Sequence, residues 1–208
     1  MKRIDNLNHW YDGWFYDKFI APNQKQYFLD ALRMIDKDST VLDVACGTGD
    51  FTMLAAKKAR EVTGIDLSRR NIQTANAKLQ NNDLTNVRFI HGNAMELSNT
   101  FKERFNYSFI SFALHEMPYN VRETVFSEMV AISEKVIVAE FAVDMAINYT
   151  GMVSRVAEFF AGFDHFKNFL NFRRNGATNE LLQKNGLSII KHKKKAMNTS
   201  ELILAGKL

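Results

Sequence analysis

The chain has 208 residues, 46% of them hydrophobic and 24% charged, with one cysteine, which excludes a disordered, fibrous or disulfide-framed protein. The formal net charge is +4, but residues 1–144 carry 17 basic and 19 acidic side chains, whereas residues 145–208 carry 10 and 4. The basic excess therefore belongs to the last third of the chain, which disfavours general nucleic-acid binding.

An N-terminal aromatic segment is followed by a regular alternation of strand-like and helix-like segments. Residues 8–35 are rich in Trp, Tyr and Phe at helical spacing, and Pro22 predicts a break between two helices there. Alternation of apolar strands with helices predicts a parallel sheet covered on both faces. The predicted strands are Thr40–Ala45, Glu61–Ile65, Val87–Ile90, Tyr107–Phe112 and Lys135–Glu140. The predicted helices between them are Thr52–Ala59, Arg69–Gln80 and Asn120–Ser133, with Ser68 and Asn120 as N-cap residues.

The pattern changes after Asp144. A long helical stretch, Met145–Phe172, and a short helix, Ala177–Lys184, precede two strand-like runs, Leu187–Lys195 and Ser200–Ala205, close enough to pair as an antiparallel hairpin. We therefore expect a doubly wound α/β fold with a mostly parallel seven-stranded sheet, an N-terminal helical cap, an inserted helical lid and a C-terminal antiparallel hairpin. One domain is expected over residues 1–208, with the cap at 1–36, the ligand-binding core at 37–144, the lid at 145–185 and the closing hairpin at 186–208.

The strongest local signal is the turn Ala45-Cys46-Gly47-Thr48-Gly49 after the first predicted strand. In doubly wound folds this turn lies where ligands bind, and glycines let the backbone approach them. A dinucleotide would place a pyrophosphate here and favours a third glycine where this chain has Thr52. The carboxylates of Asp43 and Asp50 would repel a pyrophosphate but attract a ligand with an ammonium and a sulfonium, such as S-adenosylmethionine.

The second predicted strand ends in an acid, Asp66, 17 residues after Gly49 (66 − 49 = 17). A carboxylate at this strand end can accept hydrogen bonds from both ribose hydroxyls of an adenosine. The sequence therefore predicts an adenosyl ligand, and the acidic turn favours one without phosphates.

In these motifs the stretch from Val41 to about Glu140 resembles the class I S-adenosylmethionine-dependent methyltransferases, nearest their small-molecule branch of quinone-biosynthesis and lipid-type enzymes. The matching segments are Ala45–Gly49, Gly64–Ser68, Gly92–Met95 and Ser111–Glu116. The resemblance implies S-adenosylmethionine as cofactor, with S-adenosylhomocysteine as product. It assigns the methionine portion to Asp43, Ala45, Gly47 and Gly49, the ribose and adenine face to Asp66 and Leu67, the adenine edge to Asn93 and Ala94, the methyl side to Phe112, Ala113 and His115, and closure over the cofactor to Tyr11 and Tyr16. The family usually has Asp where this chain has Asn93, whose amide oxygen can also accept from the adenine amino group.

Several residues keep two interpretations. The phenylalanines of the predicted lid fit core packing or an apolar pocket wall, and His115 fits a general base or a wall of the methyl site. The run Lys191–Lys195 fits a solvated strand edge, or attraction of anionic lipid, acidic substrate or RNA.

We expect methyl transfer to a small, apolar or aromatic acceptor. The alternatives are a non-catalytic adenosyl-binding or membrane-surface module and, less favoured, an NAD-dependent oxidoreductase. No nucleic-acid partner and no metal is expected. The sequence shows neither an apolar signal core nor a run long enough to span a bilayer, which predicts a soluble, cytoplasmic protein with at most weak membrane-surface contact.

Overall fold

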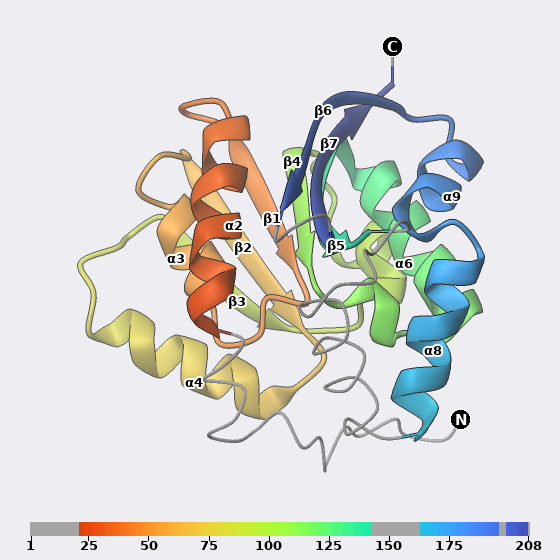
Figure 1. Cartoon of the computed structure of the whole chain (residues 1–208). Helices are drawn as coiled ribbons and strands as arrows, with labels where there is room; N and C mark the ends of the chain where they lie inside the picture. The colour runs from red at the N-terminus through yellow and green to blue at the C-terminus, as the bar shows by residue number, and fades with distance from the viewer. Residues whose placement is uncertain (1–20, 143–162, 196–198, 208) are drawn as a thin grey trace. The chain divides into compact units, whose positions relative to one another are not determined.

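The computed structural model describes residues 21–142, 163–195 and 199–207 (Figure 1). The chain divides into two compact units, Met1–Ala94 and Met95–Leu208. Tyr11, Tyr16 and residues 143–162, which include the first part of the predicted lid, lie outside the described residues. Within the described ranges, no helix combines the length and apolar character needed to cross a membrane.

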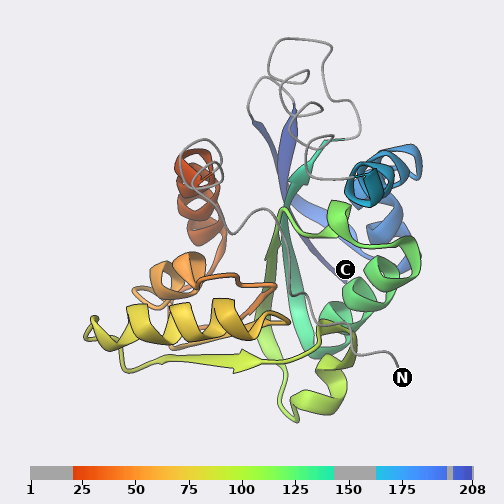
Figure 2. The same cartoon turned by 90° about the horizontal axis from the view of Figure 1, so that it is seen from below.

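The first unit contains three parallel strands: β1 (Thr40–Val44), β2 (Glu61–Asp66) and β3 (Val87–His91). These are the strands predicted from the apolar runs, since β1 and β2 are buried along almost their whole length. Figure 2 shows α3 (Asp50–Ala55) and α4 (Arg69–Gln80) against these strands, and α2 (Ala21–Met34) packs on α3. The parallel arrangement brings the carboxyl ends of the three strands to one edge.

Local sequence signals set some helix boundaries of this unit and not others. The Ser68 Oγ accepts a hydrogen bond from the Asn71 backbone N–H (3.3 Å), so the predicted N-cap of α4 is confirmed. Helix α3 begins at Asp50, two residues before the predicted start, and ends at Ala55. Pro22 lies in the first turn of α2, where a missing N–H removes no intrahelical hydrogen bond, so it does not interrupt that helix.

The second unit contains the remaining strands. The strands β4 (Phe105–Ser111) and β5 (Ser133–Phe141) are parallel, while β7 (Ser200–Gly206) runs antiparallel to both β5 and β6 (Ser188–Lys195), which confirms the predicted C-terminal hairpin. The helical elements are η1 (Ala94–Glu96), α5 (Leu97–Thr100), η2 (Leu114–Glu116), α6 (Tyr119–Ile132), α8 (Phe163–Arg174) and α9 (Ala177–Lys184). The strand order β3-β2-β1-β4-β5-β7-β6 is that of a doubly wound, mostly parallel seven-stranded sheet.

The start of α6 differs from the prediction. Pro118, not Asn120, occupies the N-cap position, with an extended backbone (φ −51°, ψ 149°). Proline fixes φ and ends the preceding loop, so the helix begins at the next residue, Tyr119. The predicted N-cap at Asn120 is therefore wrong.

Helix α8 packs on η2. The Asn168 side-chain N–H₂ donates to the carbonyl of Glu116 (2.8 Å), and the buried Arg122 donates to the carbonyl of Met117 (3.0 Å) and to Asn171 Oδ1 (3.2 Å). The two phenylalanines on its inner face, Phe169 and Phe172, are completely buried. For these two side chains the core-packing interpretation holds.

Candidate active site

Asp66, at the carboxyl end of β2, is held by the backbone of two loops. Its Oδ2 accepts a hydrogen bond from the Gly47 N–H (2.9 Å) and its Oδ1 accepts one from the Ser68 N–H (2.8 Å). Burial raises the pKa of Asp66, although these hydrogen bonds oppose the increase. The carboxyl therefore joins the glycine turn to the start of α4 in a fixed geometry.

Asp43 lies near the end of β1 and is almost completely buried, with 2% of its surface exposed. Its Oδ2 accepts a short hydrogen bond from the Thr52 hydroxyl (2.6 Å). Burial raises the pKa of Asp43 to about 7, against the Thr52 hydrogen bond and with a smaller contribution from the charge of Asp66. The charge of this carboxyl therefore changes near neutral pH, and a cationic ligand in its vicinity would favour the ionised form.

The turn between β1 and α3 holds three residues with positive φ: Ala45 (54°), Gly47 (55°) and Gly49 (83°). A Cβ on Gly49 would lie 2.4 Å from the Phe89 ring, whereas a Cβ on Gly47 would meet nothing within 4 Å. Gly49 is thus required by internal packing. Gly47 faces open space, which leaves its backbone accessible to a ligand.

The exposed carboxylate of Asp50 lies in this turn and is paired. Lys78 Nζ of α4 lies 2.7 Å from Asp50 Oδ1 and 2.8 Å from Thr48 Oγ1. This ion pair offsets the charge of Asp50, so Asp50 contributes less to the expected repulsion of a pyrophosphate. The acidic character of the turn therefore rests on Asp43 and Asp66.

The ends of β2 and β3 are aligned by their register, in which Asp66 pairs with His91. The Gly92 N–H donates to the Asp66 carbonyl (3.0 Å), which brings the loop containing Asn93 and Ala94 to the same edge. Leu67 follows Asp66 and is 41% exposed, one of few large apolar side chains so accessible in the described part of the chain. A buried carboxyl, an accessible glycine turn and an exposed leucine are the features that an adenosyl ligand requires, so this edge fits S-adenosylmethionine.

In the second unit, His115 and Glu140 form a buried pair. Nδ1 of His115 lies 2.6 Å from Glu140 Oε1, and the Glu140 carboxylate also accepts the backbone N–H groups of His115 (3.2 Å) and Phe141 (3.0 Å). Nε2 of His115 lies 3.9 Å from Glu116 Oε1. Three N–H donors converge on one carboxylate, which fixes the orientation of the imidazole.

Aromatic rings surround this pair. The Phe141 ring centroid lies 4.8 Å from that of His115 and 5.6 Å from that of Phe112, both edge to face. Phe169 of α8 lies 6.0 Å from His115. Phe112 has φ 48°, unfavourable for a residue with a bulky side chain, and Ala113 follows it at the N-cap of η2.

The structure thus groups eight of the expected residues at one edge of the first unit, namely Asp43, Ala45, Gly47, Gly49, Asp66, Leu67, Asn93 and Ala94. It groups Phe112, Ala113 and His115 at η2 of the second unit. Tyr11 and Tyr16 lie outside the described residues.

Sequence reasoning missed Thr52, Lys78 and Glu140. Glu140 carries the same signal that identified Asp43 and Asp66, since it is an acid near the end of an apolar strand. Among the described residues, no group of three or more His, Cys, Asp and Glu side chains is arranged to hold a metal ion.

Residues 41–135 match the family model described as "Methyltransferase domain". The chain is 40% identical over 91 residues to the demethylmenaquinone methyltransferase of Listeria welshimeri, an alignment that covers 42% of this chain and 38% of that protein. It therefore spans about two fifths of the length of the curated relative it matches.

Two solved structures are similar in fold. The magnesium protoporphyrin IX methyltransferase ChlM of Synechocystis PCC 6803, with bound SAH, superposes with a TM-score of 0.68 at 16% identity, covering 93% of this chain and 88% of that one. The N-methyltransferase NodS of Bradyrhizobium japonicum WM9, in complex with S-adenosyl-L-homocysteine, gives 0.65 at 15% identity, covering 94% and 92%. The family match, the strand order and the geometry of the glycine turn agree: residues 41–135 carry a methyltransferase domain, in the fold of the class I, S-adenosylmethionine-dependent enzymes.

Proposed function

We propose that the protein transfers a methyl group from S-adenosylmethionine to a small apolar acceptor, with S-adenosylhomocysteine as product. The observation that carries this proposal is Asp66 at the end of β2, tied to Gly47 and followed by the exposed Leu67. In our proposal residues 1–208 work as one methyltransferase domain, with a cap, a core, a lid and a closing hairpin.

The geometry of the strand ends supports the cofactor residues that we propose in the core. The buried Asp43 supports the charged methionine portion, where Ala45, Gly47 and Gly49 bring the backbone close. The Asp66 carboxylate accepts hydrogen bonds from the ribose hydroxyls, and Leu67 covers the adenine face. We assign the adenine edge to Asn93 and Ala94. The proposed closure over the cofactor by Tyr11 and Tyr16 rests on the resemblance to the family alone.

The charges at this edge favour an adenosyl ligand without phosphates. Asp43 and Asp66 are buried carboxyls whose ionised forms would repel a pyrophosphate. A ligand with an ammonium and a sulfonium is attracted by the same groups. The charges therefore disfavour the alternative hypothesis of an NAD-dependent dehydrogenase.

S-adenosylmethionine supplies a methyl group that is already activated by the positive sulfur. The protein's part is to orient the acceptor and to exclude water. When the accepting atom arrives protonated, its proton passes to His115. With the Nδ1 proton donated to Glu140, Nε2 is the basic nitrogen, and the carboxylate stabilises the imidazolium that forms.

The acceptor class follows from the rings around His115. Phe141, which is half-buried, packs edge to face against the imidazole and against the half-buried Phe112, and these two rings suit an apolar ring acceptor. The curated relatives are named for demethylmenaquinone. We therefore propose an apolar ring acceptor of the quinone class.

Calorimetry with S-adenosylhomocysteine tests the cofactor site. Asp66→Asn should weaken binding by about 1–3 kcal/mol, because the amide is a poorer acceptor than a carboxylate. Asp83→Asn, a change at an exposed position, should bind like the parent. If the parent fails to bind S-adenosylhomocysteine at millimolar concentration, the proposed function is wrong.

A second measurement separates the enzyme from a non-catalytic adenosyl-binding module. Turnover with radioactive methyl donor is measured across a panel of hydroquinones, phenols, amines and thiols. Tight cofactor binding with no transfer to any acceptor would favour the binding module, whereas transfer to an apolar hydroquinone supports the proposal.

A further inference from the structure

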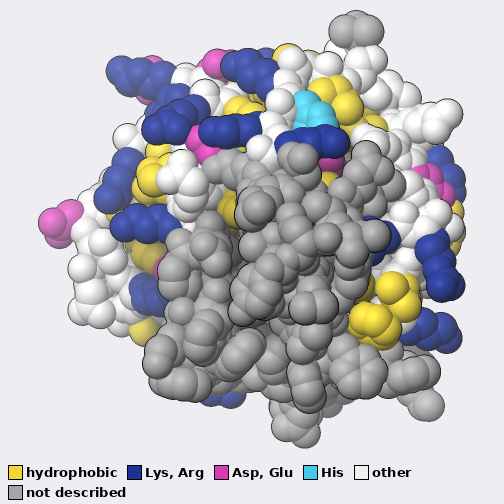
Figure 3. Space-filling view, in the orientation of Figure 1, with side chains coloured by type: hydrophobic (Ala, Val, Ile, Leu, Met, Phe, Trp, Pro, Cys, Tyr) yellow, Lys and Arg dark blue, Asp and Glu magenta, His cyan; other side chains and the backbone are white. Residues whose placement is uncertain are grey.

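Arg122 of α6 is a buried cation that the proposed mechanism does not use. Figure 3 shows lysine and arginine side chains (dark blue) at the surface, whereas Arg122 is 1% exposed. Its Nη2 donates hydrogen bonds to the carbonyls of Met117 (3.0 Å) and Asn168 (3.5 Å) and to Asn171 Oδ1 (3.2 Å). Its guanidinium carbon lies over the Phe172 ring, 4.9 Å from the ring centre, in a cation–π contact.

Packing alone does not account for an arginine at this position. The groups that accept its hydrogen bonds are neutral, and its buried Nε has no hydrogen-bond partner in the described part of the chain. Burial lowers the pKa of Arg122, and the charge of Glu140 is the largest effect that opposes this decrease. An apolar side chain of similar size would fill the same space without the cost of burying a charge.

The turn that contains η2 is held by three different elements. In the consecutive residues His115–Met117, Glu140 of β5 binds the first through its backbone N–H and its ring. The side chain of Asn168, on α8, donates to the carbonyl of the second (2.8 Å), and Arg122, on α6, donates to the carbonyl of the third (3.0 Å). Because Arg122 also binds the Asn168 carbonyl, it joins α8 and the turn to each other.

We infer that Arg122 is a positioning residue of the acceptor side, which holds the η2 turn, and with it His115, against α8. This inference rests on the proposed function, in which His115 takes the acceptor proton. The ring of Phe169, on α8, has its centroid 6.0 Å from that of His115, so the same contacts hold an aromatic neighbour of the imidazole. The positive charge of Arg122 attracts the Glu140 carboxylate and opposes formation of the imidazolium.

A titration of the His115 ring by nuclear magnetic resonance tests this inference without methyl transfer, and His115→Asn identifies the resonance. Among the described residues, the charged groups around the ring are Glu140 of β5, Glu116 of η2 and Arg122 of α6, while α8 presents the uncharged Phe169. Arg122→Gln removes the cation, so the midpoint of the titration should rise by about half a pH unit to one pH unit. An unchanged midpoint would overturn the inference.

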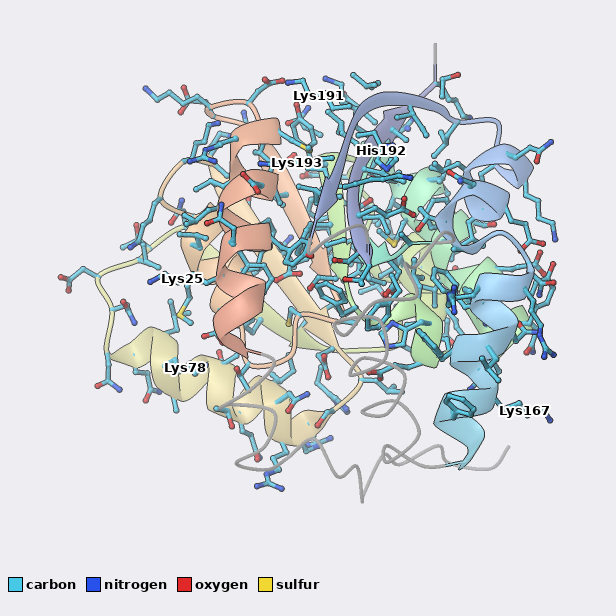
Figure 4. All side chains as sticks on the ribbon, viewed as in Figure 1. Lys25, Lys78, Lys167, Lys191, His192 and Lys193 are labelled. Carbon is cyan, nitrogen blue, oxygen red and sulfur yellow. The ribbon has the colours of Figure 1, made fainter. Side chains whose placement is uncertain are left out.

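Lys167→Gln is the matched control. It removes one positive charge from an exposed position on the outer side of α8 (Figure 4). The midpoint of the His115 titration and the kcat should both stay parental in this variant. An equal shift of the midpoint in Lys167→Gln and Arg122→Gln would show that net charge, not Arg122, sets the titration, and would also overturn the inference.

Steady-state kinetics with the best acceptor of the hydroquinone panel measure the effect on positioning. Arg122→Gln should lower kcat about 10- to 100-fold, because a misplacement of about 1 Å can cost about 100-fold. Its affinity for S-adenosylhomocysteine should stay parental. Arg122→Lys keeps the charge but not the planar fork, so it should keep the titration midpoint and recover only part of kcat. A parental kcat in Arg122→Gln would contradict the positioning role.

Asn168→Ala tests the same contact from the other side if the Arg122 variants do not fold, as thermal unfolding would show. This variant removes the hydrogen bond to the Glu116 carbonyl but no charge. Its kcat should fall about fivefold or more, with the midpoint of the His115 titration unchanged. A parental kcat would show that α8 does not position the turn. If the parent itself transfers no methyl group, the proposed function fails, whereas the titration still decides whether Arg122 acts on His115.

Discussion

Glu140 Oε1 lies 2.6 Å from His115 Nδ1, and this pair joins the end of β5 to the η2 turn 25 residues away in sequence. Neither side chain is appreciably exposed to solvent. A buried carboxylate that accepts from one ring nitrogen leaves the other as the basic atom. The pair is therefore the part of the second unit that we expect to affect catalysis most.

Glu140→Gln should lower kcat by about 100-fold or more, because a neutral amide does not stabilise the imidazolium. The affinity for S-adenosylhomocysteine should stay unchanged. Glu134→Gln, at an exposed position of the same strand, is the matched control and should keep parental activity. Steady-state kinetics and calorimetry check both variants. Full activity of Glu140→Gln would show that the His115–Glu140 pair plays no part in catalysis.

Asp43→Asn should stabilise the protein above neutral pH. The folded-state pKa of Asp43 is raised from 3.8 to about 7, so between these values the folded state holds a proton that the unfolded state has lost. The stability contributed by this group is complete below pH 4 and is lost as the pH rises through 7. At pH 8 the variant should therefore be more stable by about 2–4 kcal/mol.

Urea unfolding at pH 5 and pH 8 measures this difference. The Asn side chain can keep the hydrogen bond from Thr52, because its amide oxygen also accepts. The advantage of the variant should be smaller at pH 5 than at pH 8, and its affinity for S-adenosylmethionine should fall. A pH-independent difference between the two proteins would contradict the assigned titration.

Gly47→Ala and Gly49→Ala should separate binding from folding. Alanine at Gly49 would clash with the Phe89 ring and adopt a φ of 83°, so a loss of about 2–4 kcal/mol in unfolding free energy is expected. At Gly47 no atom lies within reach of a Cβ, and the backbone strain alone costs about 1 kcal/mol. Gly47→Ala should nevertheless bind S-adenosylhomocysteine at least tenfold more weakly, as calorimetry would show. Equal stability of the two variants would contradict this division.

Ala45→Gly should raise the unfolding free energy by about 0.5–1 kcal/mol, because glycine adopts the observed φ of 54° without strain. Ala77→Gly, at an exposed position of α4, is the opposite control and should lose a similar amount through helix propensity. Urea denaturation of both variants measures these changes in unfolding free energy. A loss of stability in Ala45→Gly would show that the left-handed backbone at Ala45 is not strained.

The strands that end at the cofactor edge could be predicted from local sequence patterns alone. Apolar runs ending near Asp43 and at Asp66, and a glycine turn between them, predicted β1, β2 and the cofactor edge, because burial of parallel strands demands continuous apolar segments. The N-cap at Ser68, expected from its residue type before a helical segment, is confirmed, since its hydrogen bond to the Asn71 N–H spans only three residues. The prediction of Asn120 as N-cap was wrong because Pro118, two residues earlier, sets the start of α6.

The partners of these groups depend on contacts between distant parts of the chain. Glu140 meets His115, and Lys78 meets Asp50 across 28 residues, through strand register and helix packing that no local pattern encodes. Burial also decides the pKa of Asp43, since the cost of charge depends on everything packed around the carboxyl. Periodicity reports which residues are apolar and how they recur, whereas the chemistry of a site depends on which distant groups the fold brings within about 3 Å of one another.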